Sequence, residues 1–157
     1  MDKVIFLDFD GVLASMDYLR ITGSLKNEMI LETNMDVYGS LFDPRCVLCL
    51  QWIIEKTKAK IVVSSVWKFM GFEKILAMWD KRDLPGKIID ITPNIDGCSC
   101  RGNEIAQWLQ KNNCERYIII DDDSDMLEEQ LPFFIHTNSI YGLNHELSVK
   151  AIKILND

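Results

Sequence analysis

The sequence lacks any long apolar run and any excess of positive charge. No uninterrupted apolar stretch approaches the length of a membrane span, so we expect no membrane partner. The formal net charge of −7 argues against a broad surface for binding a phosphate backbone, although it permits a local basic pocket. No repeat, low-complexity tract or linker divides the 157 residues, so we expect residues 1–157 to form one domain.

Five cysteines are an odd number, which argues against a framework of paired disulfides and favours reduced thiols. Met1-Asp2-Lys3 leads directly into the first predicted strand, so we expect no secretory signal and a cytoplasmic location. The alternative use of the thiols is a zinc site formed by Cys46, Cys49, Cys98 and Cys100. Their spacings match no standard zinc finger, and the first two fall in a helical pattern, which argues against that site.

Short apolar runs alternate with amphipathic helical patterns along the chain. Strands are predicted at 4–7, 60–64, 87–91 and 116–121, with a weaker fifth at 133–135, and helices at 43–58, 68–80, 102–112 and 145–155. Strands that alternate with helices predict an α/β fold, in which helices cover both faces of a parallel sheet. We therefore expect a three-layer, Rossmann-like arrangement.

The apolar run at 4–7 is followed directly by two carboxylates. Four consecutive apolar residues are typical of a strand buried on both faces of a parallel sheet. Residues two apart in an extended chain point the same way, so Asp8 and Asp10 can face a common point. Two like charges there add nothing to stability, but a magnesium ion takes oxygen ligands and offsets their repulsion. Gly11 allows a sharp turn and the close approach of a ligand.

Polar side chains also end two later strands. Ser64 and Ser65 follow the second strand, Asp121 ends the fourth, and Asp122 and Asp123 come directly after it. The carboxyl ends of the strands in an open parallel sheet lie at one edge, where ligands bind. We therefore expect these side chains to converge with the carboxylates of the first strand.

These positions together resemble the four motifs of the haloacid dehalogenase-like (HAD) phosphohydrolase superfamily. The family's motifs are Asp-x-Asp-Gly after the first strand, a Ser or Thr after the second, a basic residue that opens a later helix, and an acidic pair after the fourth strand. The matching residues occur in the right order and are Asp8, Asp10, Gly11, Ser64, Arg101, Asp121 and Asp122. The resemblance covers essentially the whole chain and implies a HAD-like fold.

Three segments resemble more narrowly a small branch of that superfamily, whose domains occur in multidomain RNA-repair (Swiss Army Knife) proteins. They are residues 64–68, residues 101–105 with Trp108-Leu109, and residues 121–123. In that branch the position of Lys68 is usually Arg. A lysine is a point charge and cannot make the bidentate contact of an arginine.

The resemblance implies a phosphatase mechanism. Asp8 would attack the phosphoryl group to form an aspartyl-phosphate, and Asp10 would protonate the leaving oxygen and then deprotonate the attacking water. Mg2+ would be held by Asp8, the backbone carbonyl of Asp10 and a carboxylate of the fourth motif, where Asp122 is preferred and Asp121 is second. An acid at position 10 favours the hydrolysis of phosphate esters over the carbon-centred chemistry of some relatives.

Four further residues are implied to bind phosphate. Ser64, or Ser65 as the alternative, would donate a hydrogen bond to a phosphate oxygen. Arg101 would stabilise the charge on the phosphoryl group during transfer, and Lys68 is the other candidate for the basic role.

Several side chains also have ordinary structural interpretations. Arg101 is alternatively a surface arginine, and Asp123 with Ser124 is alternatively a helix N-cap. Asp125 is interpreted as holding the loop after the fourth strand. Trp67 is a core residue or, alternatively, a platform that stacks on a base or sugar. The two histidines, His136 and His145, are interpreted as structural.

Residues 11–42 are the candidate for a flap or small lid, because helix, strand and helix fill the chain between the second and fourth strands. We therefore expect no large cap and a fairly open site. Such a site suits a polymer end, a protein, or a small molecule covered by a partner subunit. Tyr18, Arg20 and Lys26 in the flap would contact substrate or lie in a solvated loop.

Two classes of function stay open. One is a Mg2+-dependent phosphatase that acts on a nucleotide, a nucleic-acid end or a small metabolite. The other is a non-catalytic module of the same fold that binds a phosphorylated partner. The complete residue set favours the enzyme, because a binding module has no need for the general acid Asp10.

Overall fold

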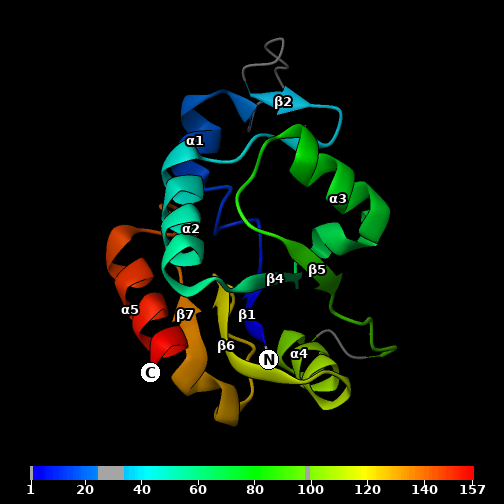
Figure 1. Cartoon of the computed structure of the whole chain (residues 1–157). Coiled ribbons are helices and arrows are strands. Elements are labelled where there is room, and N and C mark those ends of the chain that lie inside the picture. The colour runs from blue at the N-terminus through cyan, green and yellow to red at the C-terminus, as the bar shows by residue number, and fades with distance from the viewer. Residues whose placement is uncertain (1, 25–33, 98–99) are drawn as a thin grey trace.

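A parallel sheet of five strands forms the centre of the structure (Figure 1). The computed structural model describes residues 2–24, 34–97 and 100–157. The strands lie in the order β5-β4-β1-β6-β7, and neighbouring strands are parallel throughout. Their bounds are β1 Asp2–Leu7, β4 Lys60–Val63, β5 Ile88–Ile91, β6 Cys114–Asp121 and β7 Phe134–His136. The α/β, Rossmann-like prediction is confirmed, including the weak fifth strand.

The alternation of side chains along β1 explains how the core divides into two layers. Val4 and Phe6 pack on one face with residues of α4 (Arg101–Lys111), while Ile5 and Leu7 pack on the other face. All four side chains are at most 1% exposed. Successive residues of a strand point to opposite faces, so the continuous apolar run fills both layers of the core at once.

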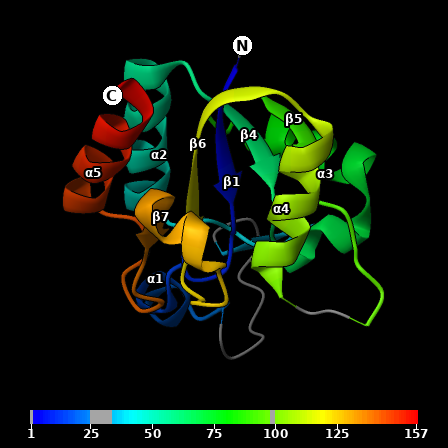
Figure 2. The same cartoon turned by 90° about the horizontal axis from the view of Figure 1, so that it is seen from below.

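Helices cover both faces of the sheet (Figure 2). The Ile5 face is covered by α2 (Pro44–Thr57), α3 (Phe72–Lys81) and α5 (His145–Asn156), of which α2 and α5 pack against each other. The Val4 face is covered by α4, through Ile105 and Trp108. Within the described ranges, no helix is both long and apolar enough to cross a bilayer.

The prediction of one helix at 68–80 is wrong in its first part. A 3₁₀ helix, η2 (Val66–Met70), follows β4, and α3 begins only at Phe72. Gly71 separates the two with φ of +95° and ψ of +151°, a conformation that glycine adopts readily and that breaks a helix. The side chain of Ser65 caps η2 by accepting a hydrogen bond from the Trp67 backbone N–H at 3.2 Å.

The segment 11–42, which is predicted to form a flap, is described at residues 11–24 and 34–42. It contains α1 (Met16–Ile21) and a short hairpin of β2 (Met35–Asp36) and β3 (Gly39–Ser40). Lys26 of the predicted flap and Cys98 of the rejected zinc site lie outside the described residues.

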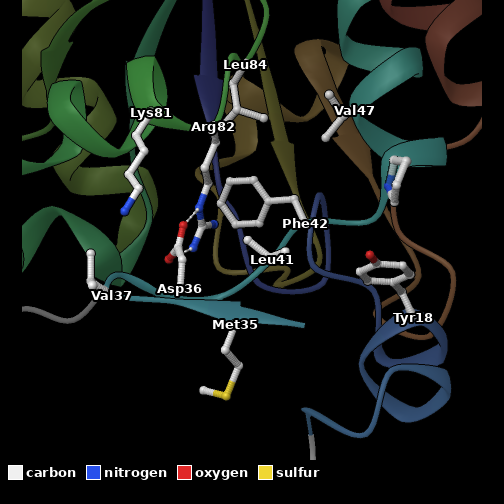
Figure 3. A pocket seen from close by; sticks show the side chains of 11 residues that line it. Tyr18, Met35, Asp36, Val37, Leu41, Phe42, Val47, Lys81, Arg82 and Leu84 are labelled. Atoms are coloured by element: carbon white, nitrogen blue, oxygen red, sulfur yellow. Dashed lines mark hydrogen bonds and ion pairs between the residues drawn. The ribbon is translucent and has the colours of Figure 1, made fainter. Parts of the chain in front are cut away.

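The hairpin is fixed to the domain by an ion pair, which Figure 3 shows beside a cavity of about 770 Å³. The Arg82 guanidinium donates to both carboxylate oxygens of Asp36, at 2.7 and 2.9 Å. Between β4 and β6 the described residues form η2, α3, β5 and α4. This agrees with the expectation that the chain has no large cap.

Candidate active site

The register of the sheet places three candidate residues in one row. Leu7 pairs with Val63 of β4 and with Ile120 of β6. The next residues along these strands are Asp8, Ser64 and Asp121, and the Asp8 N–H and Ser64 N–H continue the ladder of backbone hydrogen bonds. Neighbouring residues of a parallel sheet point to the same face. The row therefore lies on the side of the sheet that α4 covers, at the carboxyl ends of the strands.

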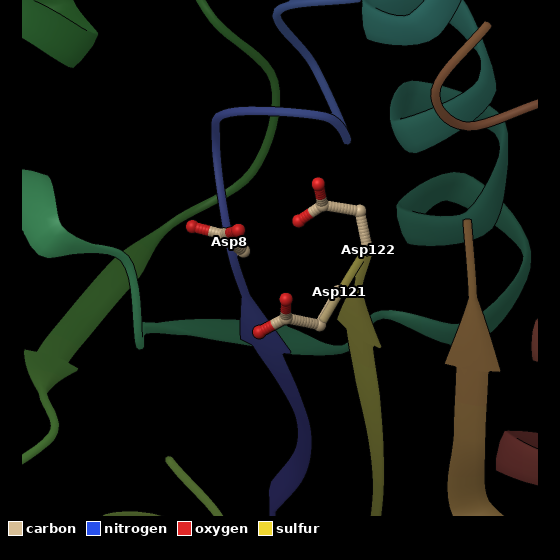
Figure 4. Close-up of side chains that lie close together, drawn as sticks. All are labelled: Asp8, Asp121 and Asp122. Atoms are coloured by element: carbon tan, nitrogen blue, oxygen red, sulfur yellow. The ribbon is translucent and has the colours of Figure 1, made fainter. Parts of the chain in front are cut away.

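Asp122 joins Asp8 and Asp121 in a cluster of carboxylates (Figure 4). One oxygen from each of the three groups lies within 4.8 Å of the other two. Gly11, with φ of +75°, makes room for this cluster, because a Cβ atom at position 11 would overlap the Asp122 carboxylate. An alanine there would therefore displace Asp122 and strain the turn.

The pKa values of three acidic residues reflect mainly their burial and also their crowding. Burial and then the neighbouring Asp8 raise the pKa of Asp121 to about 7. The same two causes raise the pKa of Asp122. Partial desolvation raises the pKa of Asp10, and so does Asp8, against a lowering effect of its hydrogen bond from Trp67. Like charges held this close disfavour ionisation in the absence of a cation.

These residues fit a magnesium site. Carboxylate oxygens are the ligands that a hard divalent cation takes, and a cation would offset the mutual repulsion that adds to burial in raising the pKa values of Asp121 and Asp122. Asp121 is already engaged, because one oxygen is paired with Arg101 and the other accepts the Asp123 N–H at 2.9 Å. The Asp122 carboxylate instead faces Asp8 and Gly11, which supports Asp122 as the better placed ligand of the acidic pair.

Arg101 is not an ordinary surface arginine. Its guanidinium Nη1 forms ion pairs with Asp121 and, at 3.1 Å, with Asp8, and its side chain is 15% exposed. Burial lowers the pKa of this guanidinium, but Asp121 and Asp8 raise it by more, so it remains charged. As predicted, the residue opens a helix, α4, whose first N–H donates to the Asp125 carboxylate at 2.9 Å. Asp125 thus holds the start of that helix, in agreement with its structural interpretation.

The two serines after β4 have different roles in the structure. The Oγ of Ser65 caps η2. The Oγ of Ser64 is buried beside Asp8 and finds no hydrogen-bond partner among the residues that the structure describes. A buried hydroxyl without a partner is costly. Its position in the row of Asp8 and Asp121 makes Ser64 the better candidate for a phosphate ligand.

Lys68 points into the protein. Its ammonium group lies 2.7 Å from Glu104 and 3.2 Å from both the Thr92 hydroxyl and the Pro93 carbonyl. The three donors of a lysine are thereby satisfied, and the side chain is only 3% exposed. The structure thus favours Arg101 over Lys68 as the basic residue near phosphate, and gives Lys68 the role of joining η2 to the first turn of α4.

Asp10 is exposed, and its carboxylate is held by Trp67. The indole N–H of Trp67 donates to Asp10 Oδ2 at 3.1 Å. The ring itself packs edge-on against Phe9, with ring centroids 5.7 Å apart. Trp67 is thus a packed residue with one polar contact to the site, and not a free stacking platform.

Asp123 and the flap residues Tyr18 and Arg20 also have defined surroundings in the structure. Asp123 does not cap a helix: it accepts the Ser124 N–H at 3.0 Å, and the next 3₁₀ helix is η3 (Glu128–Phe133). Tyr18 lines the cavity beside the hairpin, and Arg20 pairs with Asp17 on the surface.

The sequence analysis missed the support that the last strand gives to the site. Thr137, directly after β7, donates from its hydroxyl to the Gly11 carbonyl at 2.8 Å, and its N–H donates to the Asp121 carbonyl at 2.9 Å. His136 Nε2 lies 2.9 Å from the Asp122 carbonyl, while His145 stacks on Trp52. The rule that strand ends meet at one edge, applied to the fifth strand, would have indicated Thr137.

The sheet order, the acidic row and the arginine at the start of α4 define a HAD-like domain. The family model that describes the HAD domain in Swiss Army Knife RNA repair proteins matches residues 4–147. The chain belongs to this family. A search of curated proteins and a search of solved structures each found no match.

Proposed function

We propose that the protein is a Mg2+-dependent phosphatase that hydrolyses a phosphomonoester through an aspartyl-phosphate on Asp8. The observation that carries the proposal is the row of Asp8, Ser64 and Asp121 with Arg101 at 3.1 Å from Asp8. Transfer of a phosphoryl group requires a nucleophilic carboxylate, a hydroxyl that donates a hydrogen bond, and a fixed positive charge around one point. Asp8, Ser64 and the Arg101 guanidinium meet this requirement. The family supports this class of activity.

In the first step an oxygen of Asp8 forms a bond to phosphorus, and the bond from phosphorus to the leaving oxygen breaks. Asp10 gives its proton to that oxygen, which leaves as an alcohol. Ser64 and Arg101 hold the phosphoryl oxygens during the transfer.

In the second step a water oxygen forms a bond to phosphorus and gives a proton to Asp10. The bond from phosphorus to the Asp8 oxygen breaks, which releases inorganic phosphate and restores both side chains. Mg2+, held by Asp8, the Asp10 carbonyl and Asp122, would neutralise phosphoryl charge and orient the phosphate.

The test is hydrolysis of an aryl phosphate with and without Mg2+, for the wild type and for Asp8→Asn. Loss of turnover in a folded Asp8→Asn variant is expected, because an amide is not a nucleophile for this step. Asp80→Asn, the same substitution at an exposed site on α3, is the control and is expected to stay active. Full activity of Asp8→Asn would contradict the nucleophile assignment. Phosphate binding without turnover at any pH would favour the non-catalytic module.

The family match directs the choice of substrates. We propose that a nucleic-acid end or a nucleotide carries the phosphate, with a small metabolite as the competing class. A panel of 3′- and 5′-phosphorylated oligonucleotides, free nucleotides and sugar phosphates, compared by kcat/KM, distinguishes them. A preference of at least tenfold for an oligonucleotide end or a nucleotide over the sugar phosphates is expected, which is about 1.4 kcal/mol of transition-state binding. A preference for a sugar phosphate would favour the small metabolite.

A further inference from the structure

We propose that Trp67 is a positioning residue for Asp10, and that the hairpin of the flap holds Trp67 in place through Arg82. This inference rests on the proposed function, because it assigns the orientation of the general acid and base. It depends on a chain of contacts that runs from Asp36 in the hairpin to the Asp10 carboxylate.

The first link is the hydrogen bond from the Trp67 indole to Asp10 Oδ2, at 3.1 Å. Asp10 lies in an exposed turn, and an exposed carboxylate without such a bond rotates freely about its side-chain torsions. One fixed oxygen restricts those torsions and presents the other oxygen in a defined direction. A proton donor must lie within hydrogen-bond reach of the leaving oxygen, so its orientation governs its efficiency.

The second link is the packing that immobilises the indole. Trp67 packs against Phe9, the residue between the two catalytic aspartates, and against Phe42, with ring centroids 5.7 and 5.5 Å apart. Phe9 and Phe42 also contact each other at 5.2 Å. An aromatic cluster of this kind fixes ring orientation, so the N–H of Trp67 points in one direction.

The third link is the guanidinium of Arg82 at the end of α3. It lies 4.9 Å from the Phe42 ring centroid and 5.7 Å from that of Trp67, and its side chain is 5% exposed. Its Nη1 is buried and has no hydrogen-bond partner in the described part of the chain. The faces of the Phe42 and Trp67 rings stabilise this cation by cation–π contacts instead.

The last link is the ion pair between Arg82 and Asp36, which Figure 3 shows beside Phe42. Arg82 Nη2 also donates to the Gly39 carbonyl at 3.2 Å. The guanidinium thus binds both strands of the hairpin while it packs on Phe42 and on Trp67 itself. The position of the hairpin and the position of Asp10 are therefore fixed by one connected set of side chains.

The test compares Trp67→Phe with the wild type on substrates that differ in their need for an acid. Dinitrophenyl phosphate has a good leaving group that needs no protonation, whereas phenyl phosphate has a poor one. The parameter is kcat/KM, which reports the steps up to the departure of the leaving group. We expect Trp67→Phe to lower it about tenfold to a hundredfold on phenyl phosphate, the size expected for a misplaced catalytic group. On dinitrophenyl phosphate we expect kcat/KM to fall by about twofold or less, because its leaving group needs no protonation.

Trp108→Phe is the matched control. It also removes an indole hydrogen bond to an aspartate, from Trp108 Nε1 to Asp90 at 2.7 Å, and it also retains an aromatic ring. Its effect on the two substrates is expected to be equal. Equal slowing of both substrates by Trp67→Phe would overturn the positioning role and leave the phosphatase proposal intact. Absence of wild-type turnover on both substrates would overturn the phosphatase proposal and this role together.

A second readout does not depend on activity. Each of the four tryptophans is expected to give one indole N–H signal in a ¹⁵N-correlated NMR spectrum, and the signal that Trp67→Phe removes is that of Trp67. Asp10→Ala is expected to shift that signal and to leave the signal of Trp108 in place. An unmoved Trp67 signal would show that the hydrogen bond does not form in solution and would overturn the inference.

Discussion

Replacing Lys68 by methionine tests whether this lysine is an internal structural residue or a phosphate ligand. Lys68 forms an ion pair with Glu104 at an N–O distance of 2.7 Å, and the two side chains are 3% and 13% exposed, respectively. Removing one partner of such a buried pair costs about 3–5 kcal/mol, because the other charge stays buried without compensation. For a chain of this size each kcal/mol lowers Tm by about 2–4 °C, so Lys68→Met is expected to lower it by about 6–20 °C.

Two further variants isolate the pair. Glu104→Leu alone is expected to destabilise the protein similarly. The double variant Lys68→Met/Glu104→Leu is expected to recover most of the loss, because an apolar pair of similar volume can replace a buried ion pair at little cost. Lys60→Met is the control, since Lys60 and Asp2 are also 2.7 Å apart but are 36% and 48% exposed. Loss of that exposed pair is expected to leave the urea midpoint almost unchanged, because solvent screens its two charges.

The assays are urea unfolding monitored by circular dichroism and steady-state kinetics on one phosphomonoester. The free energy of unfolding follows from the transition midpoint and slope. If Lys68→Met unfolds at the wild-type urea concentration and instead raises KM severalfold, the lysine binds phosphate and the structural reasoning is refuted. A loss of stability with little change in KM supports the internal role.

Three other predictions concern the carboxylates and the serine of the site. Asp122→Asn is expected to raise the Mg2+ concentration for half-maximal activity at least tenfold, about 1.4 kcal/mol. Asp125→Asn, at the carboxylate that caps α4, is the control and is expected to leave that concentration unchanged. A magnesium titration of the activity of both variants tests whether Asp122 binds the metal. Ser64→Ala is expected to change the free energy of unfolding by about 1 kcal/mol or less, because its hydroxyl has no described partner to lose, yet to lower kcat/KM; a large loss of stability would contradict this. The pKa of Asp121 is raised from 3.8 in the unfolded chain to about 7 in the metal-free folded chain, so the folded state keeps a proton that the unfolded state releases. Stability without metal therefore falls as pH rises through this range. A cation bound to Asp8 and Asp122 would lie close to Asp121 and favour its ionised form. The difference in Tm between samples with Mg2+ and with a chelator should therefore grow from about pH 5 to about pH 8, and a constant difference would count against a metal in this cluster of carboxylates.

The fold was predictable because its signals are local. Runs of apolar residues such as 4–7 and 118–120 are buried on both faces wherever they occur in a parallel sheet. The convergence of Asp8, Ser64 and Asp121 was also predictable, since it follows from strand ends meeting at one edge. The break at Gly71 was not, because apolar residues on both sides continue a helical pattern and only the observed backbone angle interrupts it.

The partners of the site residues could not be predicted, because they lie far apart in the sequence. Glu104 is 36 residues from Lys68, and Trp67 is 57 residues from Asp10. Asp8, Ser64 and Asp121 lie at strand ends, whose mutual positions the sheet dictates. The residues that orient them come from turns and helix termini, and their reach depends on how α3 and α4 pack on the sheet. The sequence thus indicates the candidate residues of the site, whereas the hydrogen bond that Trp67 donates to Asp10 depends on tertiary packing.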